Sequence, residues 1–237
     1  MIAKLRNIVR DHKYKVGVFV LLAMASVICV SLVAARIART GTTGYTNLVW
    51  NLFLAWIPFV LAYIAYMLSW RRPMTYIVIP VFAFLWLIFF PNAPYILTDL
   101  QHLGKYAGNV PIWYDVILLV WFSWTGMLLG IVSLNLMQEI VKREIGRLAG
   151  WIFVLLVSAL TSIGVYLGRF VRLNSWDILK NPLQIASNVS DWLEDPSARS
   201  LGFIALYTLF FIFVYLTLYA FGHILREGPQ GKGRESS

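Results

Sequence analysis

Six long apolar stretches constrain how this chain folds more than any other feature of its sequence. They cover residues 16–35, 47–69, 74–90, 112–136, 148–168 and 201–222, and none has a charged residue in its middle. A helix needs about 20 mostly apolar residues to cross about 30 Å of hydrocarbon, and each stretch meets or approaches that length. Only 13% of the residues are charged, whereas a soluble domain has about 25%. The sequence therefore predicts an all-α, polytopic membrane protein with six transmembrane helices.

The chain divides into one membrane domain and two terminal segments. Residues 1–15 form a basic segment, residues 16–225 the single six-helix domain, and residues 226–237 a polar tail that we expect to be disordered. Pro58 and Pro80 fall inside the second and third stretches, where a proline kinks a membrane helix rather than ending it. The first stretch is longer than the apolar core of a signal peptide, roughly 7–15 residues, so we expect it to remain as a span.

Lysine and arginine are distributed unevenly between the two sides of this arrangement. The side that holds both termini has 13 of the 20 basic residues, and the opposite side has 7. Cytoplasmic segments of membrane proteins carry an excess of these residues, so both termini are expected in the cytoplasm. We expect the basic segment 1–15 to contact anionic lipids. Because the positive charge is divided among short segments between apolar stretches, the net charge of +9 does not indicate a nucleic-acid partner.

Two prolines interrupt the chain directly after the third stretch, in the sequence FFPNAPYILTDLQHL at residues 89–103. Asparagine is a favoured N-cap and proline is tolerated in a first helical turn. We therefore expect Asn92 to cap a short amphipathic extracytoplasmic helix over residues 93–103. At about 100° per residue, one face of this helix carries a phenol, a hydroxyl, a carboxylate and an imidazole, from Tyr95, Thr98, Asp99 and His102.

Three residues in and after this segment are candidates for chemistry. Asp99 can orient or charge His102 as a general base, and Asp115, in the sequence PIWYD, is the third candidate. Together they offer oxygen and nitrogen ligands for a divalent ion, but no spacing here is diagnostic of a metal site, and we predict none. The alternative is an interfacial helix whose Asp99 and His102 pair with loop residues. The sequence leaves the question of a cofactor open, and the absence of a specific catalytic signature favours a protein that is not an enzyme.

A second polar cluster, GRFVRLNSWDILKNP, spans residues 168–182. Arg169 and Arg172 share one face if this segment is helical, and their forked guanidinium groups suit a phosphate or a carboxylate. The same arginines would also suit lipid headgroups, or ion pairs with the two aspartates named above. Asn174 and Asp177 are typical of a variant capping box at the start of a short helix.

Two G-x-x-x-G patterns lie in the fourth and fifth stretches, at Gly126 and Gly130 and at Gly164 and Gly168. Small residues let helix backbones approach closely, so these faces are expected to pack within the bundle. Dimerisation or binding of a membrane partner through either face is the alternative.

Several classes of function lack support in the sequence. No ionisable residue lies in the middle of a stretch, where proton-coupled carriers usually place one. The Gly-rich phosphate loop, the G-x-S-x-G elbow and the H-E-x-x-H helix are missing. The single cysteine, Cys29, excludes a disulfide within the chain.

The segments FPNAPYILTDLQHL, WYD, WTGMLLG and YLGRFVRLNSWD resemble a bacterial family of polytopic membrane proteins known as domain of unknown function 1361, and NLFLAWIPF at residues 51–59 is similar too. The resemblance covers about residues 47–182. It implies a multi-pass protein of the bacterial cytoplasmic (inner) membrane and brings no assigned activity. The positions it singles out are Asn51, Pro91, Asn92, Pro94, Tyr95, Asp99, His102, Asp115, Arg169, Arg172, Asn174, Trp176 and Asp177.

Three functional hypotheses follow. The leading one is a site on the extracytoplasmic face that binds an anionic lipid headgroup or an envelope precursor. Its candidate ligand-binding residues are Arg169, Arg172, Asn92, Tyr95, Asn51, Asn174, Trp176 and Asp177. The second is a small-molecule transporter or channel that uses the broken helix at the two prolines. The third is a membrane scaffold or assembly factor that binds partner helices through its glycine faces.

Overall fold

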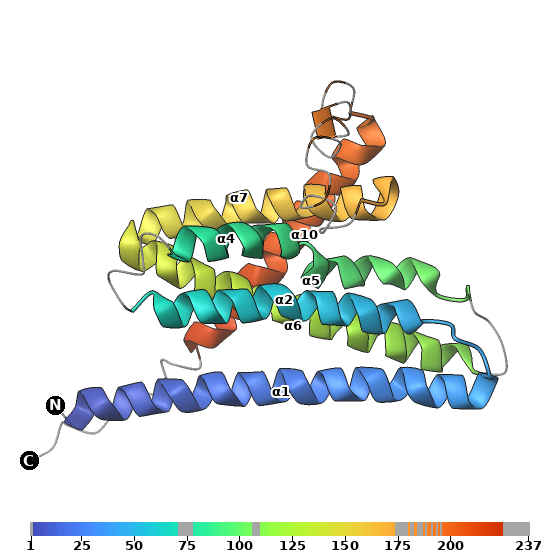
Figure 1. The fold of residues 1–237 in the computed structure, drawn as a ribbon, viewed down its shortest axis with the longest axis horizontal. Coiled ribbons are helices and arrows are strands. Elements are labelled where there is room, and N and C mark those ends of the chain that lie inside the picture. Colours follow the sequence, from blue (N-terminus) through green and yellow to red (C-terminus); the bar gives the residue numbers. More distant parts are fainter. Residues whose placement is uncertain are drawn as a thin grey trace, which may run out of the picture.

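The structure is a computed structural model, and it describes residues 2–70, 78–105, 110–173, 180, 183, 187, 189–190, 192, 194 and 196–224. Within these ranges all regular structure is helical (Figure 1). The elements are α1 (Ile2–Thr40), α2 (Thr46–Leu68), α4 (Val78–Phe89), α5 (Asn92–Tyr95), the 3₁₀-helix η1 (Ile96–His102), α6 (Ile112–Glu144), α7 (Arg147–Tyr166), the π-helix η2 (Leu167–Val171) and α10 (Ala198–Ile224).

Six helical segments are long and apolar enough to cross a membrane, which confirms the predicted fold class. They are Val16–Thr40, Thr46–Leu68, Ile79–His102, Ile112–Glu144, Arg147–Val171 and Ala198–Gly222. Most of them extend past the predicted stretches, because helices continue into charged residues at the ends of the bundle. The start of the predicted third stretch, residues 74–77, and the predicted tail 226–237 lie outside the described residues.

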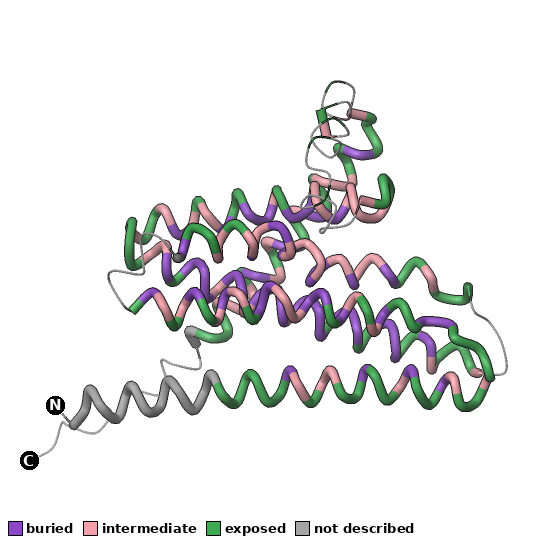
Figure 2. The backbone as a smooth tube through the Cα atoms, in the orientation of Figure 1, coloured by how far each residue is buried: buried purple, intermediate pink, exposed green. Residues whose placement is uncertain are grey.

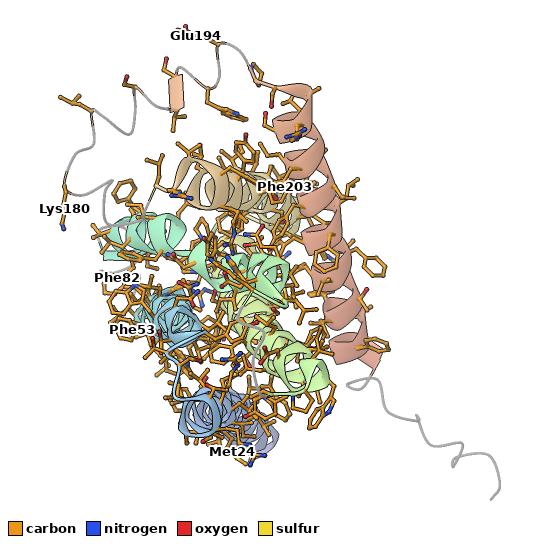
Figure 3. All side chains as sticks on the ribbon, turned by 90° about the vertical axis from the view of Figure 1, so that its right-hand side faces the viewer. Met24, Phe53, Phe82, Lys180, Glu194 and Phe203 are labelled. Atoms are coloured by element: carbon orange, nitrogen blue, oxygen red, sulfur yellow. The ribbon has the colours of Figure 1, made fainter. Side chains whose placement is uncertain are left out.

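Helix α6 is the centre of the bundle, since α1, α2, α5, η1 and α7 all pack against it. Helix α1 lies along one edge, packed on α6 and α2, and most of its residues from Val16 to Thr40 are exposed (Figures 1 and 2). Helix α10 packs on α7. We call the end of the bundle where residues 41–45 join α1 to α2 the connector end. Figure 3 looks onto this end, with Met24 of α1 at one edge and α10, which carries Phe203, along another side.

The third span is broken rather than followed by a separate interfacial helix. Helix α4 ends at Phe89, and Pro91 precedes α5 as its N-cap residue without a side-chain cap hydrogen bond. The expected capping role of Asn92 is therefore wrong: its side-chain amide donates to the carbonyl of Phe89 at 2.9 Å. Segments α5 and η1 then run along α6 and α2 toward the connector end (Figure 1), so that the predicted amphipathic segment forms the second half of a span.

The glycine faces accommodate this break. A Cβ atom at Gly126 would lie 2.7 Å from the carbonyl oxygen of Ala93, and one at Gly164 would lie 2.7 Å from the Pro91 ring. Gly130 faces Ala93 and Pro94, and Gly168 faces the ring of Tyr95. Both glycine faces are thus occupied within the chain by the irregular segment 91–95 and its neighbours. Binding of a second copy or a partner protein stays a prediction.

Candidate functional site

Arg169, on the π-helix η2, is held in a fixed orientation by three residues of the broken span. Its Nε and Nη2 donate to Thr98 Oγ1 at 2.8 and 2.6 Å, and Nη2 also donates to Asp99 Oδ1 at 2.6 Å. The guanidinium carbon lies 4.4 Å from the centroid of the Tyr95 ring, within reach of a cation–π interaction. Only 9% of the Arg169 side chain is exposed.

Asp99 is the centre of this arrangement. It is 1% exposed, and its second oxygen accepts a hydrogen bond from the Asn51 side-chain amide of α2 at 2.9 Å. The Nδ1 atom of His102 lies 3.5 Å from Asp99 Oδ1, which is longer than a good hydrogen bond. We call this set the Asp99 network: Asn51, Tyr95, Thr98, Asp99, His102 and Arg169. Residues up to 118 positions apart meet here, supplied by α2, α5, η1 and η2.

The 3₁₀ geometry of η1 explains why Asp99 lies inside the protein. A 3₁₀-helix has three residues per turn, so residues at i and i+3 are aligned. Ile96 is fully buried, and its side chain lies against α6 at Gly126. Asp99 follows Ile96 on that inward line and His102 comes next, toward the connector end.

Gln101 is a site residue that the sequence did not reveal. With its amide oxygen turned toward Arg169, it accepts from Nη1 at 3.0 Å and from Nε at 3.2 Å. Thr98 and Gln101 are three residues apart, so they are aligned on a 3₁₀-helix and would also be neighbours on an α-helix. This spacing was a signal in the sequence that could have identified Gln101.

The π-helix is the local reason that Arg169 reaches η1. A π-turn inserts one extra residue into a helix and rotates the side chains that follow, and such turns are frequent at functional sites. Gly168 permits the close approach, because a Cβ there would lie 3.3 Å from the Tyr95 ring.

Asp115 belongs to a second, separate ion pair. Both of its oxygens are bound by Arg36 of α1, from Nε at 2.7 Å and from Nη2 at 3.1 Å. The Arg36 side chain is fully buried, and its guanidinium lies 4.8 Å from the Tyr45 ring centroid. In the sequence Arg36 is one of the seven basic residues on the side opposite the termini, and that count gave no sign of a buried ion pair. It is, however, in heptad phase with the buried residues Leu22 and Cys29.

The three residues that could together have offered ligands to a divalent ion are therefore divided between two clusters. Asp99 and His102 lie together, while Asp115 pairs with Arg36. Among the residues with described side chains, no three of the types His, Cys, Asp and Glu lie close enough to hold a metal ion.

The remaining predicted site residues have different placements. Arg172 is exposed and ends η2 in the left-handed conformation, with φ 63°, so it does not continue one α-helical face with Arg169. Tyr95 and Asn51 are in the Asp99 network, whereas Asn92 bonds back to α4. Asn174, Trp176 and Asp177 lie outside the described residues.

Comparison with known proteins identifies a family. No curated protein and no solved structure matches the chain. A family described as a protein of unknown function (DUF1361) matches residues 50–214, which include every member of the Asp99 network and exclude Arg36. Because the match covers more than half of the 237 residues, this membrane-spanning chain belongs to the DUF1361 family.

Proposed function

We propose that this protein is a bacterial inner-membrane protein that binds the anionic headgroup of a lipid or an envelope precursor at its connector end. In this proposal both termini are cytoplasmic and the connector end is extracytoplasmic, as the distribution of lysine and arginine favours. The basic segment 1–15 contacts anionic lipids of the opposite leaflet.

One observation carries the binding proposal: Arg169 presents a preoriented guanidinium edge. Asp99 and Thr98 engage Nε and Nη2, which leaves Nη1 toward Gln101. Gln101 is an exposed, neutral side chain, so an oxygen of a phosphate or carboxylate can replace its amide oxygen and gain a charge-assisted bond. Preorganisation reduces the entropy lost on binding.

An anion would be attracted by individual basic side chains at the connector end. In this topology the sequence gives that side seven basic residues, Arg36, Arg39, Lys105, Arg169, Arg172, Lys180 and Arg199, and six acids, Asp99, Asp115, Asp177, Asp191, Glu194 and Asp195. Arg36 and Arg169 are paired with the buried acids Asp115 and Asp99. The attraction for an anion therefore depends on local positive charge, such as that of the exposed Arg172, rather than on a large net charge.

The broken third span is the feature that favours the second candidate, a transporter or channel. However, about one helical turn farther from the connector end than the Asp99 network, apolar side chains form a buried cluster. Leu52 and Ala55 follow Asn51 on α2, and Ile96 precedes Asp99; all three belong to one core cluster with Phe122. This packing supports a site that opens at the connector end over a packed interior.

We expect Arg172→Gln to weaken binding of anionic lipid about fivefold, since one arginine near a headgroup contributes about 1 kcal/mol. The measurement is native mass spectrometry of the full-length protein titrated with short-chain phosphatidylglycerol and phosphatidylcholine. Arg39→Gln is the matched control, because Arg39 is exposed at the same end but lies on α1. Equal retention of both lipids by the wild-type protein would contradict the proposal.

The orientation has its own test. A periplasm-active reporter fused after Lys105 is expected to be active, and one fused after Lys142 is expected to be inactive. Lys105 lies just after η1 at the connector end, and Lys142 lies in the last turn of α6 at the opposite end of the bundle. The reverse pattern would place the Asp99 network on the cytoplasmic side and remove an extracytoplasmic ligand from consideration.

A further inference from the structure

The imidazole of His102 is oriented with one nitrogen toward the protein. Its Nδ1 is buried, 3.5 Å from Asp99 Oδ1, and forms no hydrogen bond with the residues that the structure describes. A lone pair on Nδ1 would face a carboxylate oxygen and repel it, whereas an N–H there is attracted. The neutral imidazole therefore carries its proton on Nδ1, and its Nε2 is a hydrogen-bond acceptor.

Among the residues that the structure describes, the groups around His102 hold it without a hydrogen bond to Nε2. Tyr45, the N-cap residue of α2, donates its hydroxyl to the His102 carbonyl at 3.1 Å, and the Lys105 backbone N–H donates to the same carbonyl at 3.0 Å. Arg169 of η2 binds the same Asp99 oxygen that Nδ1 faces. The His102 side chain is 22% exposed, so a ligand at the connector end can reach the imidazole.

Arg169 and His102 are adjacent because both approach Asp99 Oδ1, at 2.6 and 3.5 Å. Arg169 offers positively charged hydrogen-bond donors, and the neutral imidazole of His102 offers a hydrogen-bond acceptor. A small ligand that binds both Arg169 and His102 must carry an anionic group. It must also carry, within a few bonds of that group, a group that donates a hydrogen bond. A phosphate ester with a neighbouring hydroxyl has this composition.

We propose that the headgroup bound at this site is a phosphate ester whose alcohol carries a free hydroxyl, with the phosphate on Arg169 and the hydroxyl donating to His102 Nε2. This inference rests on the proposed function and narrows its ligand to hydroxylated phospholipid headgroups of the phosphatidylglycerol type. His102 then sets which anionic headgroup is preferred, while the arginines set the affinity for all of them.

The test compares three short-chain lipids on the purified full-length protein by native mass spectrometry: phosphatidylglycerol, phosphatidic acid and phosphatidylcholine. The wild-type protein is expected to bind phosphatidylglycerol best and phosphatidylcholine least. His102→Phe keeps a ring but removes the acceptor, and is expected to lower binding of phosphatidylglycerol about three- to tenfold, the usual net effect of one neutral hydrogen bond. Binding of phosphatidic acid should not change. His223→Phe is the matched control, since His223 lies near the end of α10.

The outcomes separate the two proposals. If neither anionic lipid is preferred over phosphatidylcholine, the proposed function fails and this inference fails with it. If both are preferred but the ratio between them is the same in the wild-type protein and in His102→Phe, only the role of His102 is overturned.

A second measurement uses the wild-type residue at position 102, so it does not depend on whether a His102 variant folds. NMR of the wild-type protein with nitrogen-labelled histidine reports the tautomer of each of its three histidines, and His12→Gln and His223→Gln assign the signals by elimination. A proton on Nδ1 is the expected result for His102. A proton on Nε2 would make that atom a donor and overturn the inference.

Discussion

Replacing Asp115 with alanine is expected to lower the free energy of unfolding by about 3–5 kcal/mol, because Arg36 would remain buried without its carboxylate. The Arg36 and Asp115 side chains are 0% and 5% exposed, and two hydrogen bonds join them. The pair also fixes α1, whose residues from Val16 to Thr40 are mostly exposed (Figure 2). The face of Tyr45 remains near Arg36 in the variant, but a neutral ring does not replace a carboxylate.

Thermal unfolding in detergent, followed by the loss of monodisperse protein, measures this effect. Glu144→Ala is the matched control: it breaks an ion pair with Arg143 whose side chains are 31% and 33% exposed, and about 1 kcal/mol or less is expected. The double variant Arg36→Met and Asp115→Leu, which leaves no unpaired charge, should recover most of the loss. Equal destabilisation by Asp115→Ala and Glu144→Ala would contradict the structural role of the buried pair.

The six spans were predictable because each depends on the length and hydrophobicity of one continuous segment, regardless of which helices pack beside it. Their ends were less predictable. The first span was expected to stop at Ala35 because Arg36 follows, yet α1 continues to Thr40. The charge of Arg36 is neutralised by a residue 79 positions away, and no local pattern contains that pairing.

The third span shows a different limit. Its two prolines correctly predicted the break, and the two glycine faces correctly predicted close packing. The sequence did not connect them: the partner of Gly126 and Gly164 is the broken segment itself, at Ala93 and Pro91. Since the glycines remove steric obstruction, the irregular segment is accommodated inside the bundle, and the interfacial helix predicted for residues 93–103 is replaced by a continued span.

The candidate residues were also easier to predict than their partners. The residue types indicated Asp99, His102 and Arg169 as possible site residues, and an ion pair with Asp99 was one of several interpretations of Arg169. To tell whether Asp99 or Asp115 is the partner of Arg169, one must know how η1 and η2 lie relative to each other. That arrangement depends on a 3₁₀-helix and a π-helix. Neither turn type has a sequence pattern that periodicity detects.

The second large effect is expected at Arg169. Arg169→Met should lower the free energy of unfolding by about 3–5 kcal/mol, because Asp99, which is 1% exposed, would keep Asn51 but lose its only ion-paired arginine among the described residues. The double variant Asp99→Leu and Arg169→Met removes both charges. It should recover most of the stability, since replacing a whole buried pair with apolar residues is often neutral or stabilising.

The double variant separates the structural role of the pair from its binding role. If Arg169 presents its Nη1 edge to an anionic headgroup, the double variant is stable but no longer prefers phosphatidylglycerol over phosphatidylcholine. Thermal unfolding and lipid titration on the same preparation measure the two quantities. A stable double variant that keeps the wild-type lipid preference would show that Arg169 serves only to neutralise Asp99, and that the anion binds elsewhere on the connector end.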